Sequence, residues 1–176
     1  MPRTEVVFTG FGGQGVVLSG IVLARAALYD EKGVVQTQSY GPEARGGACR
    51  AEVIISDEVV YYPFVEEADI LVAMSQEALD KYINSIRKGG RLIVDSTTIT
   101  RIPPKARVKL SKIAATDIAS GKLGKVIVAN IVMLGALTNL TGIVSREAME
   151  KAVRASIPRG TEEINLKALE AGYSYS

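Results

Sequence analysis

The sequence EVVFTGFGGQG at residues 5–15 carries the clearest structural signal in the chain. Its first five residues are mostly β-branched or aromatic, which is typical of a strand, and its glycines predict a tight turn. An aliphatic, alanine-rich stretch follows to about Tyr29 and predicts a helix, and residues 34–38 predict a second short strand. This order is a βαβ unit, whose two strands run parallel. The opening therefore predicts an α/β fold.

The rest of the chain continues the pattern of strands and helices. Alternating residues predict a strand over 50–55, and residues 56–58 predict a hairpin turn into a second strand over 59–62. The apolar segment 68–74 predicts a strand buried on both faces. The other predicted elements are a helix from Ser75 to about Arg87, strands over 91–95 and 108–114, and helices over 126–140, 145–156 and 161–171. We expect one domain over residues 1–176: a three-layer α/β/α, Rossmann-like fold with a mainly parallel sheet, an antiparallel hairpin and a helical C-terminal third.

Composition limits the chemistry that this chain can perform by itself. It has 176 residues, no histidine and a single cysteine, Cys49. Without histidine it lacks the usual proton shuttle at neutral pH and the usual partner of a serine or cysteine nucleophile. One cysteine cannot hold an iron–sulfur cluster, a cysteine zinc site or an internal disulfide. We therefore assign no catalytic residue and no metal ligand to this chain.

Charge and hydropathy bear on partners and location. Lys plus Arg is 21 and Asp plus Glu is 19, so the net charge is +2, and it is not gathered in one block. No nucleic-acid partner is expected from that pattern. The apolar stretches 16–28 and 126–137 are too short to span a membrane, and residues 6–8 are too short for a signal core. We expect a cytoplasmic protein without a membrane partner, and a lone cysteine fits a reducing compartment.

The turn GFGGQG places Gly10, Gly12 and Gly15 in a Gly-x-Gly-x-x-Gly spacing between a predicted strand and a predicted helix. Glycines there permit a tight turn and a close approach to the backbone. The free N–H groups of the first helical turn favour a phosphate or a carboxylate. Together with Gly13 and Gln14, these residues form a candidate polar cradle. The alternative is a tight strand-to-helix turn that binds nothing.

The strand after this unit does not fit a dinucleotide site. Such a site needs an acidic residue at the end of the second strand to bind the ribose hydroxyls. This chain has Gln36, Thr37 and Gln38 there, and no arginine for a 2′-phosphate. The sequence thus disfavours NAD and NADP, and favours an anion or a different phosphate-bearing molecule.

A second glycine-rich loop, SYGPEARGG at residues 39–47, follows the second strand. It should lie at the same carboxyl edge of the sheet as the glycine turn, where open α/β sheets bind their ligands. The charges of Glu43 and Arg45 would orient a substrate or a neighbouring subunit, and Gly46 and Gly47 permit a close approach to the backbone. The alternative is a structural salt bridge in an irregular loop.

Two further residues need an interpretation. Cys49 adjoins the second loop, but no histidine activates it, so we interpret it as structural. Asn130 is the amide in the otherwise apolar helix NIVMLGAL, residues 130–137. That helix is either the centre of the domain or half of a subunit contact. The side-chain amide of Asn130 forms its hydrogen bonds either with a backbone group or with a ligand.

The motifs GFGGQG, SYGPEARGG and NIVMLGAL occur in this order and resemble the gamma subunit of the 2-oxoacid:ferredoxin (or acceptor) oxidoreductases. The similarity covers nearly the whole chain. It implies a complex that decarboxylates a 2-oxoacid on thiamine diphosphate, passes two electrons through iron–sulfur clusters to ferredoxin or another acceptor, and transfers the acyl group to coenzyme A. It also implies that the thiamine diphosphate and the clusters belong to partner subunits of alpha, beta and delta type.

Under this resemblance, coenzyme A is the candidate ligand of the glycine turn, and the loop at residues 43–47 faces the thiamine-bearing subunits. The candidate binding residues are Gly10, Gly12, Gly13, Gln14, Gly15, Glu43, Arg45, Gly46, Gly47 and Asn130. Two alternatives stay open: a free-standing nucleotide-binding oxidoreductase, and a non-catalytic assembly module. The sequence does not indicate which 2-oxoacid is used, the subunit stoichiometry or the physiological electron acceptor.

Overall fold

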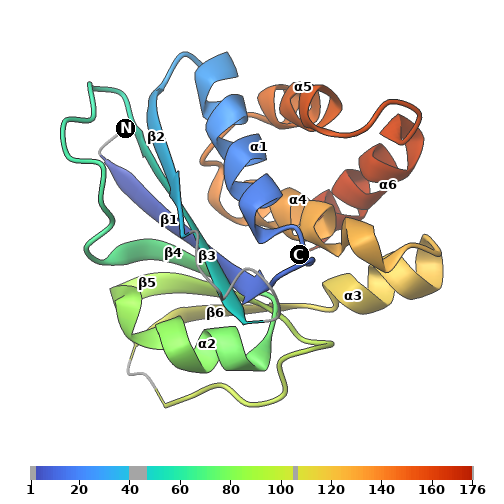
Figure 1. Cartoon of the computed structure of the whole chain (residues 1–176), viewed down its shortest axis with the longest axis horizontal. Coiled ribbons are helices and arrows are strands. Elements are labelled where there is room, and N and C mark those ends of the chain that lie inside the picture. Colours follow the sequence, from blue (N-terminus) through green and yellow to red (C-terminus); the bar gives the residue numbers. More distant parts are fainter. Residues whose placement is uncertain (1–2, 40–46, 105–106, 176) are drawn as a thin grey trace.

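The computed structural model describes residues 3–39, 47–104 and 107–175. Among these residues, six strands form one sheet in the order β2-β3-β1-β4-β5-β6 (Figure 1). The strands are β1 (Thr4–Phe11), β2 (Gly33–Gln38), β3 (Ala48–Ser56), β4 (Ala68–Ala73), β5 (Ile86–Asp95) and β6 (Lys109–Ile113).

β3 runs against the other described strands. β1 pairs in parallel with β4, β4 with β5, and β5 with β6, whereas β3 is antiparallel to both β1 and β2. β1 and β2 therefore point the same way, as the predicted βαβ unit requires, but β3 lies between them. The mainly parallel sheet predicted from the sequence is confirmed.

Helices cover both faces of the sheet and complete three layers. One face carries α2 (Gln76–Tyr82), and the other side holds α1 (Val16–Tyr29), α4 (Ala129–Thr141), α5 (Arg146–Ser156) and α6 (Glu162–Tyr173) (Figure 1). Shorter helical turns lie at α3 (Ala115–Asp117) and at residues 83–85, 118–122 and 126–128. Val6 and Phe8 of β1 belong to the core beneath α1 and α4, and Val7 belongs to the core beneath α2. This alternation along β1 is the two-residue period of a strand. The predicted layers and the helical C-terminal third are confirmed.

The predicted strand over residues 59–62 is wrong. No described residue between β3 and β4 is in a strand, and Val59 and Tyr61 are 70 % and 91 % exposed. The reason is that β1 and β2 already pair with the two edges of β3, so no edge is left for another partner. The antiparallel hairpin is instead β2–β3, which the loop at residues 39–47 connects.

The predicted helix from Ser75 begins where expected but ends early. The Ser75 Oγ accepts a hydrogen bond from a backbone N–H in the first turn of α2 at 3.3 Å, as an N-cap does. α2 ends at Tyr82, so its predicted extension to Arg87 is wrong. Ile86 is only 2 % exposed and pairs with Ala68 of β4, so the chain has already entered β5 at that point.

α4 and α6 cross in close contact at two glycines. Gly135 of α4 lies against the α6 backbone at Leu169 and Gly172, and an added Cβ would lie 3.0 Å from the Gly172 Cα. α4 is buried over residues 129–138 by the chain itself. This helix is therefore the centre of the fold, the first of the two alternatives predicted for it. In the described part of the chain, no helix is both long enough and apolar enough to cross a bilayer.

The α4–α6 crossing gives a stability prediction. Gly135→Ala should lower the free energy of unfolding by about 1–3 kcal/mol, because the added methyl overlaps the backbone of α6. Gly121→Ala is the matched control, since a Cβ at Gly121 meets no described atom within 4 Å. Urea unfolding of both variants measures the difference. Equal midpoints for the two variants would contradict the close crossing.

Candidate functional site

The glycine turn connects the end of β1 to the start of α1 at the carboxyl edge of the sheet (Figure 1). The backbone N–H of Gln14 donates to the carbonyl of Phe11 at 3.1 Å and closes the turn. Gly13 and Gly15 have φ angles of 96° and 74°, in the left-handed region that favours glycine. No described side chain caps α1 at Gly15. The first turn of α1 therefore presents backbone donors, and the positive end of its dipole, to an anion.

The side chain of Gln14 fixes the shape of the turn. Its Oε1 accepts a hydrogen bond from the Phe11 N–H at 2.6 Å, and its Nε2 donates to the Met74 carbonyl at 2.9 Å. Met74 directly follows β4, so Gln14 ties the ends of β1 and β4 together. A Cβ at Gly10 would lie 2.6 Å from the Gln14 Oε1, which explains the glycine at that position. The donors that face a ligand at this turn are thus chiefly backbone amides.

Asn130 of α4 supports the turn from the other side. This side chain is 2 % exposed, and its Nδ2 donates to the Gly15 carbonyl at 3.3 Å. A Cβ at Gly15 would lie 2.8 Å from the Asn130 Cγ. Of the two alternatives predicted for the amide, a backbone group provides the partner. The structure thereby brings the apolar-helix motif into contact with the glycine turn.

The two described ends of the second glycine-rich loop lie beside the glycine turn. Gly10 pairs with Cys49 across the β1–β3 ladder, and Phe11 pairs with Ala48. At the other end of the loop, the Ser39 N–H donates to the Arg50 carbonyl at 3.1 Å. Both ends of the loop therefore lie at the carboxyl edge, as the sequence predicts.

The candidate residues of this loop divide between described and undescribed parts of the chain. Gly47 is described and directly precedes β3, whereas Glu43, Arg45 and Gly46 lie outside the described residues. Cys49 is 8 % exposed within the core beneath α1, which agrees with its structural interpretation.

Two hollows flank the glycine turn. One, of about 510 Å³, lies between the turn and α2, and a smaller one, of about 60 Å³, lies between the turn and the start of α4. Gln14 lines both of them. The larger is lined by Phe11, Gln14, Ser75, Gln76, Glu77, Asp80 and Thr98, and the smaller by Gly13, Gln14, Met74, Thr116, Val126, Ile127 and Ala129.

Two threonines in these walls were not expected from the sequence. The Thr98 Oγ1 donates to the Met74 carbonyl at 2.8 Å, the same carbonyl that accepts from Gln14. The Thr116 Oγ1 donates to the buried carboxylate of Asp95 at 2.5 Å. These hydroxyl groups hold the ends of β4 and β5 next to the turn. Thr98 also donates to the nearby Asp95 carbonyl at 3.3 Å, but the bonds that bring these threonines to the turn join residues 24 and 21 apart, so no local pattern marks them.

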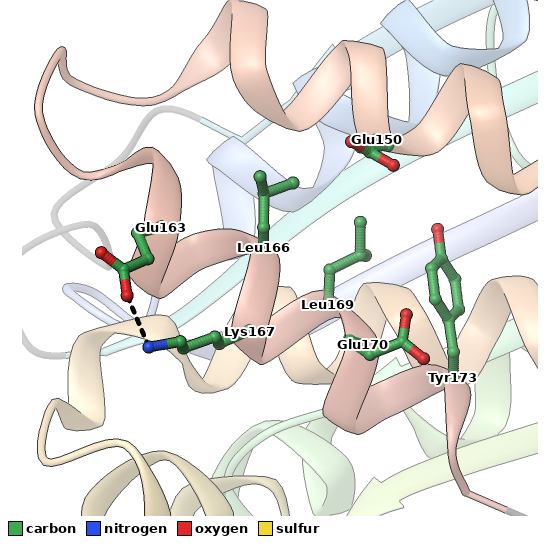
Figure 2. Close-up of a pocket in the computed structure, with 7 residues that line it drawn as sticks. All are labelled: Glu150, Glu163, Leu166, Lys167, Leu169, Glu170 and Tyr173. Atoms are coloured by element: carbon green, nitrogen blue, oxygen red, sulfur yellow. Dashed lines mark hydrogen bonds and ion pairs between the residues drawn. The ribbon is translucent and has the colours of Figure 1, made fainter.

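A third hollow, of about 360 Å³, lies between α5 and α6 (Figure 2). Its charged side chains are three carboxylates and one ammonium group, Lys167, which pairs with Glu163 at 2.6 Å and lowers the pKa of that carboxyl. Burial raises the pKa of Tyr173, in the same wall, to about 12. The lining residues are Glu150, Glu163, Leu166, Lys167, Leu169, Glu170 and Tyr173. Its negative wall does not suit a phosphate.

Known proteins match this chain over nearly its full length. The family model described as pyruvate ferredoxin/flavodoxin oxidoreductase matches residues 5–175. The chain belongs to that family. A relative named 2-oxoglutarate synthase subunit KorC, from Methanocaldococcus jannaschii, is 56 % identical over 173 residues, 97 % of this chain and 92 % of that protein. Ketoisovalerate oxidoreductase subunit VorA, from Methanothermobacter thermautotrophicus, is 37 % identical over 99 % of this chain and 37 % of its own length.

A solved structure supports the same membership. The keto/oxoacid ferredoxin oxidoreductase gamma subunit from Geobacter sulfurreducens has a TM-score of 0.87 and 47 % identity, covering 97 % of this chain and 96 % of that one. The resemblance to gamma subunits, drawn from three motifs, is confirmed. Its relatives are named as subunits of 2-oxoacid oxidoreductases, which favours a gamma-type subunit over a free-standing oxidoreductase.

The contact between Gly15 and Asn130 gives a double-mutant prediction. Gly15→Ala should destabilise the chain by about 1–3 kcal/mol, because the Cβ overlaps the Asn130 amide and φ is positive. In an Asn130→Ala background the overlap with the amide is gone and a 3.3 Å contact with the Cβ of residue 130 remains, so Gly15→Ala should cost less, about 1 kcal/mol, mainly from backbone strain. Urea unfolding of the wild type, the two single variants and the double variant gives the coupling free energy between the two positions. Strictly additive effects would contradict the contact.

Proposed function

We propose that this chain binds coenzyme A at the glycine turn and serves as the gamma subunit of a 2-oxoglutarate:ferredoxin oxidoreductase. The observation that carries the proposal is the start of α1 at Gly15, which no described side chain caps and which Gln14 and Asn130 hold in one shape. Backbone amides preset in this way bind a phosphate group without reorganisation. The alpha, beta and delta-type subunits and ferredoxin are the proposed partners, in the cytoplasm.

The residues of the turn fit a phosphate-bearing ligand. A Cβ at Gly13 would enter open space, with no described atom within 4 Å, so the turn leaves room for a ligand against its backbone. Asp80, in the wall of the larger hollow, pairs with Arg101 at 2.7 Å, which offsets its charge. When bound, coenzyme A supplies the thiol that accepts the acyl group. The part of this chain is to hold the phosphate end with the amides of Gly13, Gly15 and Val16, because the Gln14 amide already donates within the turn.

The redox chemistry is proposed to lie in partner subunits. This chain has no histidine and one buried cysteine, so it cannot ligate an iron–sulfur cluster by itself. Thiamine diphosphate and the clusters are assigned to the other subunits, where the 2-oxoacid loses carbon dioxide and two electrons pass to ferredoxin. The gamma subunit then contributes binding and orientation of the acyl acceptor.

The choice of 2-oxoglutarate rests on the pattern of similarity. Two relatives named 2-oxoglutarate synthase subunit KorC are 56 % and 54 % identical to this chain, each over 97 % of it. A relative named ketoisovalerate oxidoreductase subunit VorA is 37 % identical, and one named pyruvate synthase subunit PorC is 32 % identical. The chain is thus more similar to these two 2-oxoglutarate subunits than to the relatives named for other oxoacids.

Coenzyme A binding is tested with a charge placed at the turn. In the assembled complex, Gly13→Asp should weaken coenzyme A binding about tenfold or more, because a carboxylate near a phosphate costs on the order of 1–3 kcal/mol. Gly13→Asn is the matched control, since asparagine has the same shape and a similar tolerance of positive φ but no charge. Isothermal titration gives both dissociation constants. Equal affinity for the two variants would place coenzyme A elsewhere.

Substrate choice is tested separately, on the unmodified complex. The value of kcat/KM should be highest for 2-oxoglutarate, by about 100-fold or more over pyruvate and 2-oxoisovalerate, because a site that pairs a second carboxylate rejects substrates lacking it. Ferredoxin reduction measures all three rates. A preference for pyruvate or 2-oxoisovalerate would overturn the assignment of 2-oxoglutarate as substrate, but it would not contradict the proposed coenzyme A site.

A further inference from the structure

The segment DEVVYYPFVEE at residues 57–67, which we name the β3–β4 arm, exposes four large apolar side chains. Tyr61 is 91 % exposed, Val59 70 %, Phe64 59 % and Tyr62 49 %. The rings of Tyr62 and Phe64 contact edge to face, with their centroids 5.6 Å apart. Exposed aromatic clusters of this kind mark interaction surfaces, where tyrosine is among the residues that carry most binding energy.

Charged side chains hold the arm in one shape. Arg3 donates from Nη1 to the Tyr62 carbonyl at 2.9 Å and from Nη2 to the Phe64 carbonyl at 3.0 Å. Arg3 also pairs with Glu5 at 2.7 Å, and the second oxygen of Glu5 accepts the Glu66 N–H at 3.2 Å. A loop fixed in this way loses little conformational entropy when a partner covers it. The arm is therefore preorganised for binding.

The arm adjoins β2, the edge strand of the sheet that has fewer residues to prevent pairing with another chain. The carbonyl of Glu58 lies beside Gly33, the first residue of β2, where an added Cβ would come within 2.5 Å of it. The sequence of β2, GVVQTQ, contains none of the lysines or prolines that keep edge strands from pairing with other chains. β6, at the opposite edge, contains Lys109 and Lys112. The β2 edge and the arm together form one surface suited to a partner.

Charge indicates what the partner presents. The arm has four acidic residues and no basic one: Asp57, Glu58, Glu66 and Glu67. We propose that the β3–β4 arm seats its aromatic side chains in an apolar pocket with a basic rim on another subunit of the oxidoreductase complex. In the relative VorA, the matching region accounts for 37 % of the polypeptide, so that region is joined to further chain there. A second copy of this chain fits less well, because its own arm carries the same four acidic residues, and like charges across an interface repel.

The test uses the complete complex. The labelled gamma subunit is titrated with the remaining subunits, and the dissociation constant is compared among variants. Tyr61→Ala/Phe64→Ala should raise it about tenfold or more, because buried aromatic anchors dominate interface energies. Leu28→Ala is the matched control, since Leu28 is 59 % exposed, like Phe64, but lies at the end of α1. It should leave the dissociation constant unchanged.

Further variants separate loss of binding from loss of folding, and they test the charge of the partner's rim. Tyr61→Ala alone removes a side chain that is 91 % exposed, so the chain should fold even if the double variant does not. Glu66→Lys/Glu67→Lys should weaken assembly and reverse its salt dependence if the rim is basic. Wild-type assembly by folded Tyr61→Ala would overturn the proposal. Loss of self-association by the arm variants, with binding of the other subunits intact, would assign the arm to a second copy instead.

Discussion

β3 pairs with β1 over eight residues and with β2 over six, antiparallel to both. This arrangement requires β3 to start where β1 and β2 end, so the two described ends of the loop at residues 39–47 lie at the same sheet edge as the glycine turn. The register is fixed by burial: Cys49, Ala51 and Val53 face the core beneath α1, while Arg50 and Glu52 face the other side. A slip by one residue would move the charged pair into the apolar core beneath α1 and carry Ala51 and Val53 to the other face, where Arg50 and Glu52 are 20 % and 15 % exposed, and the lost apolar packing strongly disfavours it. The candidate site depends on this pairing.

The glycine turn is rigid because its neighbours satisfy the polar groups that shape it. Gln14 bridges Phe11 and Met74, and Asn130 reaches Gly15 from α4. The glycines at 10 and 15 are the positions where a side chain would displace these amides. The donors at the start of α1 are therefore held ready for an anion, and binding does not have to order them. This is a binding role, which agrees with a chain that lacks histidine and has a single cysteine.

Local sequence patterns predicted most of the fold, and their failures have non-local causes. The glycine turn, the buried α4 and the Ser75 cap each depend on nearby residues, and the structure has them where the sequence predicts them. Residues 59–62 have the β-branched and aromatic character of a strand, but whether a sheet edge is available depends on distant strands. Likewise, Thr98 and Thr116 line the hollows beside the glycine turn only because the fold brings distant parts of the chain together. The contact between Asn130 and Gly15 joins residues 115 apart, so the sequence indicated its members without showing that they meet.

The central claim is that the amides of Gly13, Gly15 and Val16 hold a phosphate of coenzyme A within the assembled complex. A structure of that complex with coenzyme A bound tests it most directly. The account predicts a phosphate oxygen within hydrogen-bond distance, about 2.7–3.2 Å, of at least two of these backbone nitrogens. The account would be contradicted by a structure in which the phosphates of coenzyme A contact another subunit and none contacts the glycine turn.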